Sequence, residues 1–217
     1  MAIKRFFATK DNTITNAFKD GLATRGTGSN MGASDILEVF SIYGQASSAS
    51  SELARTLVEF DTADIATKRT AGSIPASGSV DFFLRMYDAE HVESTPRDFK
   101  LTIAAISQSW SEGAGLDMNN YTDIGESNWI KAASSTNWAS EGGTFLTSSA
   151  YPNMHKTQSF DGGTEDLNVN VTSIVEEWLK TNDKPNYGFG VFLTSSQETA
   201  TESYYTKKFF ARQSEFF

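Results

Sequence analysis

Apolar and polar residues alternate in several separate stretches of the chain. The alternation is clearest in residues 53–60, where Ala54, Val58 and Phe60 share one face of an extended segment. It recurs in residues 80–87 and 99–105. A period of two residues is typical of a β-strand that buries one face. The same pattern predicts further strands at residues 3–9, 36–43, 167–171, 187–193 and 204–212.

Strands in this number, with almost no helical periodicity between them, indicate the fold class. Regular alternation of strands and helices, which would indicate a parallel sheet, is missing. The sequence therefore predicts an all-β fold, an antiparallel β-sandwich of jelly-roll type with long loops. We expect one such domain over residues 1–217.

One short helix is predicted at about residues 173–180. Ser173 and Glu176 have the spacing of a capping box, and Pro185 follows the end of the pattern. Four apolar residues fall on one helical face: Ile174, Val175, Trp178 and Leu179. Two turns are too short to be stable alone. We therefore expect Trp178 to hold the helix against a sheet. A single weak helical turn is indicated at residues 63–67.

Two long stretches, residues 10–34 and 108–159, are rich in Gly, Ser, Asn and Thr and are predicted as loops.

Composition and charge narrow the classes of function. The 217 residues include no cysteine, which excludes disulfides and thiolate metal sites, and the net charge is −9. A nucleic acid or an anionic membrane would repel such a chain, so neither is an expected partner. Neither a signal region nor an apolar run of about 20 residues occurs, which predicts a leaderless virion protein made in the host cytoplasm. The lack of cysteines suits this interpretation and does not exclude an exported protein. Phe216 and Phe217 are expected to pack on a partner, unless the native chain continues beyond 217.

Catalytic motifs are not evident, so we do not expect an enzyme. The two histidines, His91 and His155, lie in polar stretches, and no Gly-x-Ser-x-Gly motif is present. The glycines of residues 26–32 have neither the spacing nor the following lysine of a phosphate loop.

Calcium is the one metal that the sequence suggests. Asp117, Asn119 and Asp123, followed by Glu126, give the oxygen-rich pattern of a calcium loop. However, Tyr121 stands where a ligand is needed, so a solvated acidic loop is the alternative. The same two interpretations apply to the acidic residues within 161–166. No other cofactor is expected.

Several motifs resemble those of DNRLRE-type domains, which are β-sandwiches similar to carbohydrate-binding modules. The strand 53–61 resembles the Arg-x-Leu-hydrophobic-x-Phe-Asp strand of that family, and the glycine-rich residues 26–32 precede it as in the family. Residues 101–112 resemble its alanine-rich strand that leads to Trp-x-Glu, and Trp129 follows about twenty residues later, as in the family. The most specific match is Val171, Thr172, Val175, Trp178, Asn186, Tyr187, Gly188 and Phe189. The sequence also resembles virion structural proteins of tailed phages that carry such domains.

The resemblance implies that most of its aromatic residues pack in the core. The residues expected there are Phe60, Trp110, Trp129, Trp178, Tyr187 and Phe189. Trp138 and Tyr151 lie outside the matched motifs. They are therefore the candidates for stacking against a sugar ring.

Two functions remain open at this point. The first is a non-enzymatic structural protein of a phage virion, in capsid decoration, neck or tail, that contacts copies of itself and other virion proteins. The second is a carbohydrate-binding module or adhesin domain that recognises a polysaccharide.

Overall fold

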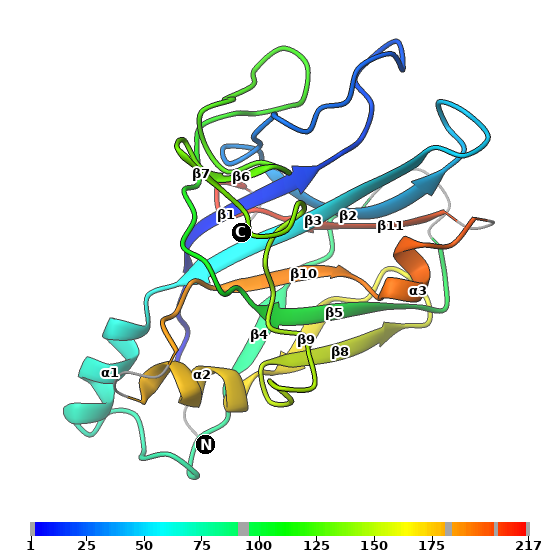
Figure 1. Cartoon of the computed structure of the whole chain (residues 1–217). Helices are drawn as coiled ribbons and strands as arrows, with labels where there is room; N and C mark the ends of the chain where they lie inside the picture. Colours follow the sequence, from blue (N-terminus) through cyan, green and yellow to red (C-terminus); the bar gives the residue numbers. More distant parts are fainter. Residues whose placement is uncertain (1–2, 91–95, 181–183, 202–203, 216–217) are drawn as a thin grey trace.

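A curled antiparallel sheet of seven strands forms the centre of the computed structural model, which describes residues 3–90, 96–180, 184–201 and 204–215 (Figure 1). Six strands follow one another across the sheet: β11 (Tyr205–Phe210), β2 (Ile36–Tyr43), β3 (Ser51–Phe60), β10 (Phe189–Leu193), β5 (Phe99–Ala105) and β8 (His155–Phe160). The seventh, β1 (Ala8–Thr15), also pairs with β3.

The sheet forks at β3. Ala54 pairs with both Thr15 and Phe40, while Val58 pairs with both Asp11 and Phe189. Because a strand has two edges, β1 occupies one edge along its length, and β2 and β10 share the other. One half of β3 thus continues into β2 and β11, and the other half into β10, β5 and β8.

Two small sheets and three short helices complete the described structure. One small sheet pairs β4 (Phe83–Met86) with β9 (Leu167–Asn170), and the other pairs β6 (Lys131–Ala133) with β7 (Thr136–Asn137). The helices are α1 (Thr62–Thr70), α2 (Thr172–Leu179) and α3 (Ser195–Glu198). This arrangement confirms the predicted all-β, antiparallel, sandwich-like fold. Of the helices, α1 is longer than the single turn predicted, and α3 was not predicted.

The main core lies between one face of the curled sheet and a layer made of β4, β9 and α2. Trp178 is 8% exposed, and its ring centroid is 4.7 Å from that of Phe189 on β10. The predicted packing of this indole against the sheet is therefore confirmed. Arg69 of α1 donates two hydrogen bonds, of 2.9 and 2.7 Å, to Glu176 of α2, and its guanidinium holds the pKa of Glu176 below the usual range.

A second apolar cluster covers the opposite face of β3. Trp110, Trp129 and Trp138 bury their rings there, supplied by residues 106–146. Arg55 of β3 lies 5.1 Å from the Trp129 ring and forms a bidentate ion pair with Glu198, at 2.8 and 2.6 Å. This layer of loops, together with residues 16–35, gathers at one end of the molecule, opposite α1 and α2 (Figure 1). We call it the outer cover.

The first strand was predicted at residues 3–9, which was wrong. The reason is that the outer cover buries polar residues further along the chain. The strand is β1, which extends through polar residues that the sequence placed in a loop. Asn12 is fully buried, and its polar atoms have partners inside the protein: Nδ2 donates to Ser127, and Oδ1 accepts from the N–H of Met31. Internal hydrogen bonds therefore offset the cost of burying a polar strand.

The N-terminal caps of α1 and α2 and the position of strand β8 also differ from the predictions. The side chain of Ser173 does not cap α2; its hydroxyl donates to the carbonyl of Asn153. The first helix is longer than expected because Asp61 caps it by accepting from the N–H of Ala63. All but the last residue of strand β8 (His155–Phe160) lies in the stretch 108–159 that was predicted as a loop. In the described part of the chain, no helix has the length and apolar character needed to cross a bilayer.

Candidate ligand-binding groove

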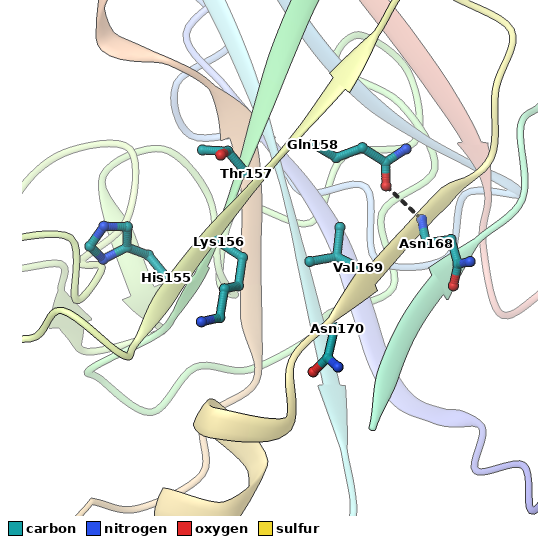
Figure 2. A pocket seen from close by; sticks show the side chains of 7 residues that line it. All are labelled: His155, Lys156, Thr157, Gln158, Asn168, Val169 and Asn170. Carbon is teal, nitrogen blue, oxygen red and sulfur yellow. Dashed lines mark hydrogen bonds between the residues drawn. The ribbon is translucent and has the colours of Figure 1, made fainter. Parts of the chain in front are cut away.

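A polar groove lies where the edge of the large sheet meets the edge of a small one. Strand β8 is the last strand of the large sheet, and β9 pairs with β4 alone. The two strands converge at Gln158 and separate toward the other end (Figure 2). At the point of convergence, Asn168 N donates to Gln158 Oε1 at 2.8 Å and Gln158 Nε2 donates to Asp166 O at 2.9 Å.

The turn between β8 and β9 is fixed by carboxylates and a buried lysine. Glu165 Oε1 accepts from Gly162 N at 2.6 Å. Burial raises the pKa of Glu165, but the hydrogen bonds from the backbone of this turn outweigh it, so that the pKa is lowered overall. Lys207 of β11 is fully buried, pairs with Asp88 and donates to the carbonyl of Gly163. The converging end of the groove is therefore held rigidly.

The open part of the groove has a volume of about 600 Å³. Its walls carry carboxamides, a cation and a hydroxyl rather than a continuous apolar lining, and Lys156 and Val169 occupy the space between the strands (Figure 2). The lining residues are His155, Lys156, Thr157, Gln158, Asn168, Val169 and Asn170. Such a lining suits a neutral ligand with many hydrogen-bonding groups.

Aromatic side chains stand beside the groove on the outer face of β4. Phe83 is directly opposite Asn170 on β9, and Arg85 is opposite Asn168. Because Leu84 and Met86 point into the core, Phe83 and Arg85 point outward, and the Phe83 ring is 55% exposed. The Arg85 guanidinium lies 5.3 Å from the Tyr87 ring. The groove thus adjoins a face with both rings and amides.

Trp138 does not have the position predicted for a sugar-stacking residue. Its side chain is 5% exposed, and its indole N–H donates to Asn128 O at 2.8 Å. The ring packs in the outer cover with Trp110 and Trp129, so neither face is open to a ligand. The expectation of an exposed ring at Trp138 was wrong because a loop without periodicity gives no indication of what it covers.

Tyr151, the other candidate, is 38% exposed. It begins the turn that leads into β8, since Met154 N donates to its carbonyl. Asn153 in the same turn accepts from Ser173, which lies just after β9. Tyr151 is therefore near the open end of the groove, where the Lys184 ammonium lies 5.7 Å from its ring.

The residues expected to form the core are placed as follows. Trp110, Trp129, Trp178 and Phe189 are buried, while Phe60 and Tyr187 are half-buried and pack against the apolar clusters.

The side-chain oxygens of the candidate calcium ligands accept hydrogen bonds from backbone N–H groups. Asp117 Oδ1 accepts from the N–H groups of residues 119, 120 and 121, and these bonds, with that of Asn120 first, lower the pKa of Asp117. Asp123 accepts from Ala114 N and Gly125 N, and Asn119 accepts from Asp20 N. Among the described residues, no three acidic or histidine side chains lie together in a way that could hold a metal. The structural calcium stays a prediction.

The structure places the histidines and the glycine-rich residues as follows. His155 lines the groove, but its buried Nδ1 has no hydrogen-bond partner there, and His91 lies outside the described residues. The glycine-rich residues 26–32 serve packing: Asn30 is fully buried, donating to Glu112 O and Ser127 O and accepting from the N–H groups of Gly32 and Gly115. A Cβ on Gly115 would lie 2.0 Å from the Asn30 carbonyl oxygen, which requires glycine there.

A buried carboxyl group on β1, beneath the outer cover, has a raised pKa. Asp11 is 2% exposed, and burial, with Glu112 beside it, raises its pKa to about 6 against the opposing effect of Arg212. Arg212 N donates to Asp11 Oδ2 at 2.6 Å, whereas Asp11 Oδ1 has no partner among the described residues.

Comparison of the chain with protein-family models, curated proteins and solved structures finds no match. The resemblance to DNRLRE-type domains therefore rests on the sequence motifs alone and stays a prediction.

Sequence reasoning missed the residues of the groove. The alternation in residues 80–87 puts Phe83 on the same face as Asp81 and Arg85, and this was the available indication that its ring is exposed. Gln158 gave no such indication, because its strand lay in a stretch without periodicity.

Proposed function

We propose that this protein is a non-enzymatic carbohydrate-binding module, and that the groove between β8 and β9 with the adjoining face of β4 binds a polysaccharide. The observation that carries the proposal is the combination of a carboxamide-lined groove with the exposed Phe83 ring beside it. Sugar hydroxyls need paired donors and acceptors, which Asn and Gln side chains supply. An aromatic ring supplies the contact for the apolar face of a pyranose.

Glycan-array binding of the purified protein tests the proposal. We expect a small set of glycans to bind the wild-type protein, and Phe83→Ala to weaken that binding about tenfold, because loss of one stacking ring removes roughly 1 kcal/mol or more. Isothermal titration with the best glycan would measure the change.

Ile124→Ala provides a matched control, since Ile124 is an even more exposed apolar side chain in the loop that carries Asp123. Binding that falls equally in both variants would reflect general adhesion rather than a site at Phe83. An array without any bound glycan would contradict the proposal.

A second candidate, a virion structural subunit, is favoured by a different observation. Ile3 and Phe7 are almost fully exposed just before β1, and exposed apolar side chains are typical of contacts between subunits. In this candidate the partners are copies of the chain and other virion proteins. The two functions are compatible, because a groove at one edge of the sandwich leaves these residues free for assembly.

Size-exclusion chromatography with light scattering distinguishes the second candidate. A structural subunit is expected to form a ring or trimer that Phe7→Asp dissociates while the monomer remains folded. A wild-type protein that stays monomeric at high concentration would contradict the use of Ile3 and Phe7 as evidence for a virion structural subunit.

A further inference from the structure

A buried lysine and a carboxylate lie in direct contact on two neighbouring segments of the chain. Lys207 of β11 is fully buried, and its Nζ pairs with Asp88, whose side chain is 11% exposed. The two segments lie side by side, because Asp88 forms an antiparallel β-bridge with Phe209. Asp166 Oδ1 accepts from Asp88 N at 2.9 Å. The backbone on both sides therefore holds the carboxylate next to the lysine.

The surroundings of this pair are largely closed to water. Lys207 Nζ lies 5.2 Å from the centroid of the Phe160 ring and 5.4 Å from that of Phe209, and both rings are fully buried. By contrast, Lys208 pairs with Glu38 at 3.0 Å where the two side chains are 36% and 32% exposed. The cost of removing two charges from water can exceed their mutual attraction. An uncharged arrangement of the two buried groups is therefore favoured.

The hydrogen atoms of the Lys207 ammonium indicate what that arrangement is. An ammonium has three N–H donors. One donates to Asp88, one donates to the carbonyl oxygen of Gly163 at 2.9 Å, and the third has no hydrogen-bond partner among the described residues. An amide between Nζ and the Asp88 side chain would keep a single N–H. The Gly163 carbonyl already lies where it can accept from that N–H, and no buried charge would remain.

We infer that Lys207 and Asp88 are joined by an isopeptide bond that the folded protein forms by itself. Nζ transfers one proton to an oxygen of Asp88, and the neutral amine then attacks Cγ. The bond between Nζ and Cγ forms, the bond between Cγ and the protonated oxygen breaks, and that oxygen leaves as water with a second proton from Nζ. The third hydrogen stays as the amide N–H that donates to Gly163 O. The balance is one water released, with no other reactant consumed.

The fold meets the two conditions that this condensation needs. Groups held in contact can react at an effective concentration on the order of 10⁵ M or more, which favours the bond over the separate amine and acid. Burial among the rings excludes the water that would reverse the reaction. The bond fastens β11, at one end of the large sheet, to the segment that follows β4. It is compatible with either candidate function and depends on neither.

Mass spectrometry of the intact, denatured protein tests the inference. We expect the main species of the wild-type protein to be lighter than its sequence by the mass of one water molecule. Proteolysis is expected to release a peptide in which Lys207 and Asp88 are linked. Lys207→Met and Asp88→Ala are expected to have their full sequence masses. Lys208→Met removes the neighbouring, exposed lysine, so it is the matched control and is expected to keep the loss of water.

Two results would overturn the inference. A wild-type protein that keeps its full mass after prolonged incubation in the folded state would show that the contact is an ion pair only. A loss of water that persists in Lys207→Met would place the dehydration elsewhere in the chain. Peptide mapping of the wild-type protein decides the question even where a variant fails to fold, because the linked peptide is either present or absent.

Discussion

The outer cover and the groove have the same kinds of residue and use them in opposite ways. The outer cover and the groove each contain asparagines and aromatic rings. In the outer cover, Asn30 is fully buried with four internal hydrogen bonds, and Trp138 is enclosed. In the groove, Asn170 and Phe83 are exposed, and among the described strands β9 pairs with β4 alone.

This difference shows that residue type alone does not distinguish a packing region from a candidate binding region in this chain. What distinguishes them is whether the nearby backbone N–H and carbonyl groups need the side chains as hydrogen-bond partners. The outer cover consists of long loops whose own N–H and carbonyl groups need partners, so buried side-chain amides are used to satisfy them. The groove is bounded by two strand edges that do not pair with each other. Four substitution pairs, from the largest expected effect to the smallest, test this comparison.

The aromatic rings give the largest contrast. Trp138→Ala is expected to lower the free energy of unfolding by about 4 kcal/mol, because it leaves a cavity in the outer cover and removes the partner of Asn128 O. Phe83→Ala is expected to change it by less than about 0.5 kcal/mol, since the ring is exposed. Urea denaturation of both variants checks this. Similar losses in the two variants would show that the rings do not differ in role.

The asparagines give the next contrast. Asn30→Ala is expected to cost about 3 kcal/mol, because it leaves the N–H groups of Gly32 and Gly115 without their acceptor in a buried site. Asn168→Ala is expected to be nearly neutral, since the backbone of Asn168, not its side chain, bonds to Gln158. Thermal unfolding by circular dichroism would measure both. A neutral Asn30→Ala would contradict the role assigned to the buried amides.

A buried carboxyl group gives a pH-dependent contrast. Because the pKa of Asp11 is raised to about 6, the folded state holds a proton between roughly pH 4 and 6 that the unfolded chain has released. Asp11 therefore adds a loss of stability as the pH rises through this window, on the order of 2–3 kcal/mol, which is complete above the folded pKa.

Asp11→Asn removes this contribution, so the variant gains stability relative to the wild type as the pH rises from 4 to 7. Denaturation midpoints at several pH values measure the difference between the two proteins, in which the other carboxyl groups cancel. Asp20→Asn, at an exposed position, serves as the control. A difference between the wild type and Asp11→Asn that stays constant with pH would contradict the assignment.

Local periodicity predicted the parts of the fold that bury one face of a regular element. Strands β2 and β5 were predicted with the bounds that they have, and the burial of Trp178 followed from helical spacing. Strand β1 was missed over residues 10–15 because its burial depends on Ser127, more than a hundred residues away. The groove could not be predicted, since the bonds of Gln158 to β9 arise only when two separate strands converge.

The smallest effect concerns two exposed tyrosines, of which one borders the groove. Tyr151→Ala is expected to weaken glycan binding about three- to fivefold, because the ring lies near the open end of the groove and contributes part of a stacking contact. Tyr121→Ala, in the loop beside Asp20, removes a more exposed ring and is expected to leave binding unchanged. Titration of both variants with the same glycan measures the ratio of their affinities. A loss in Tyr121→Ala without one in Tyr151→Ala would move the binding surface to the loops of the outer cover and reverse the comparison.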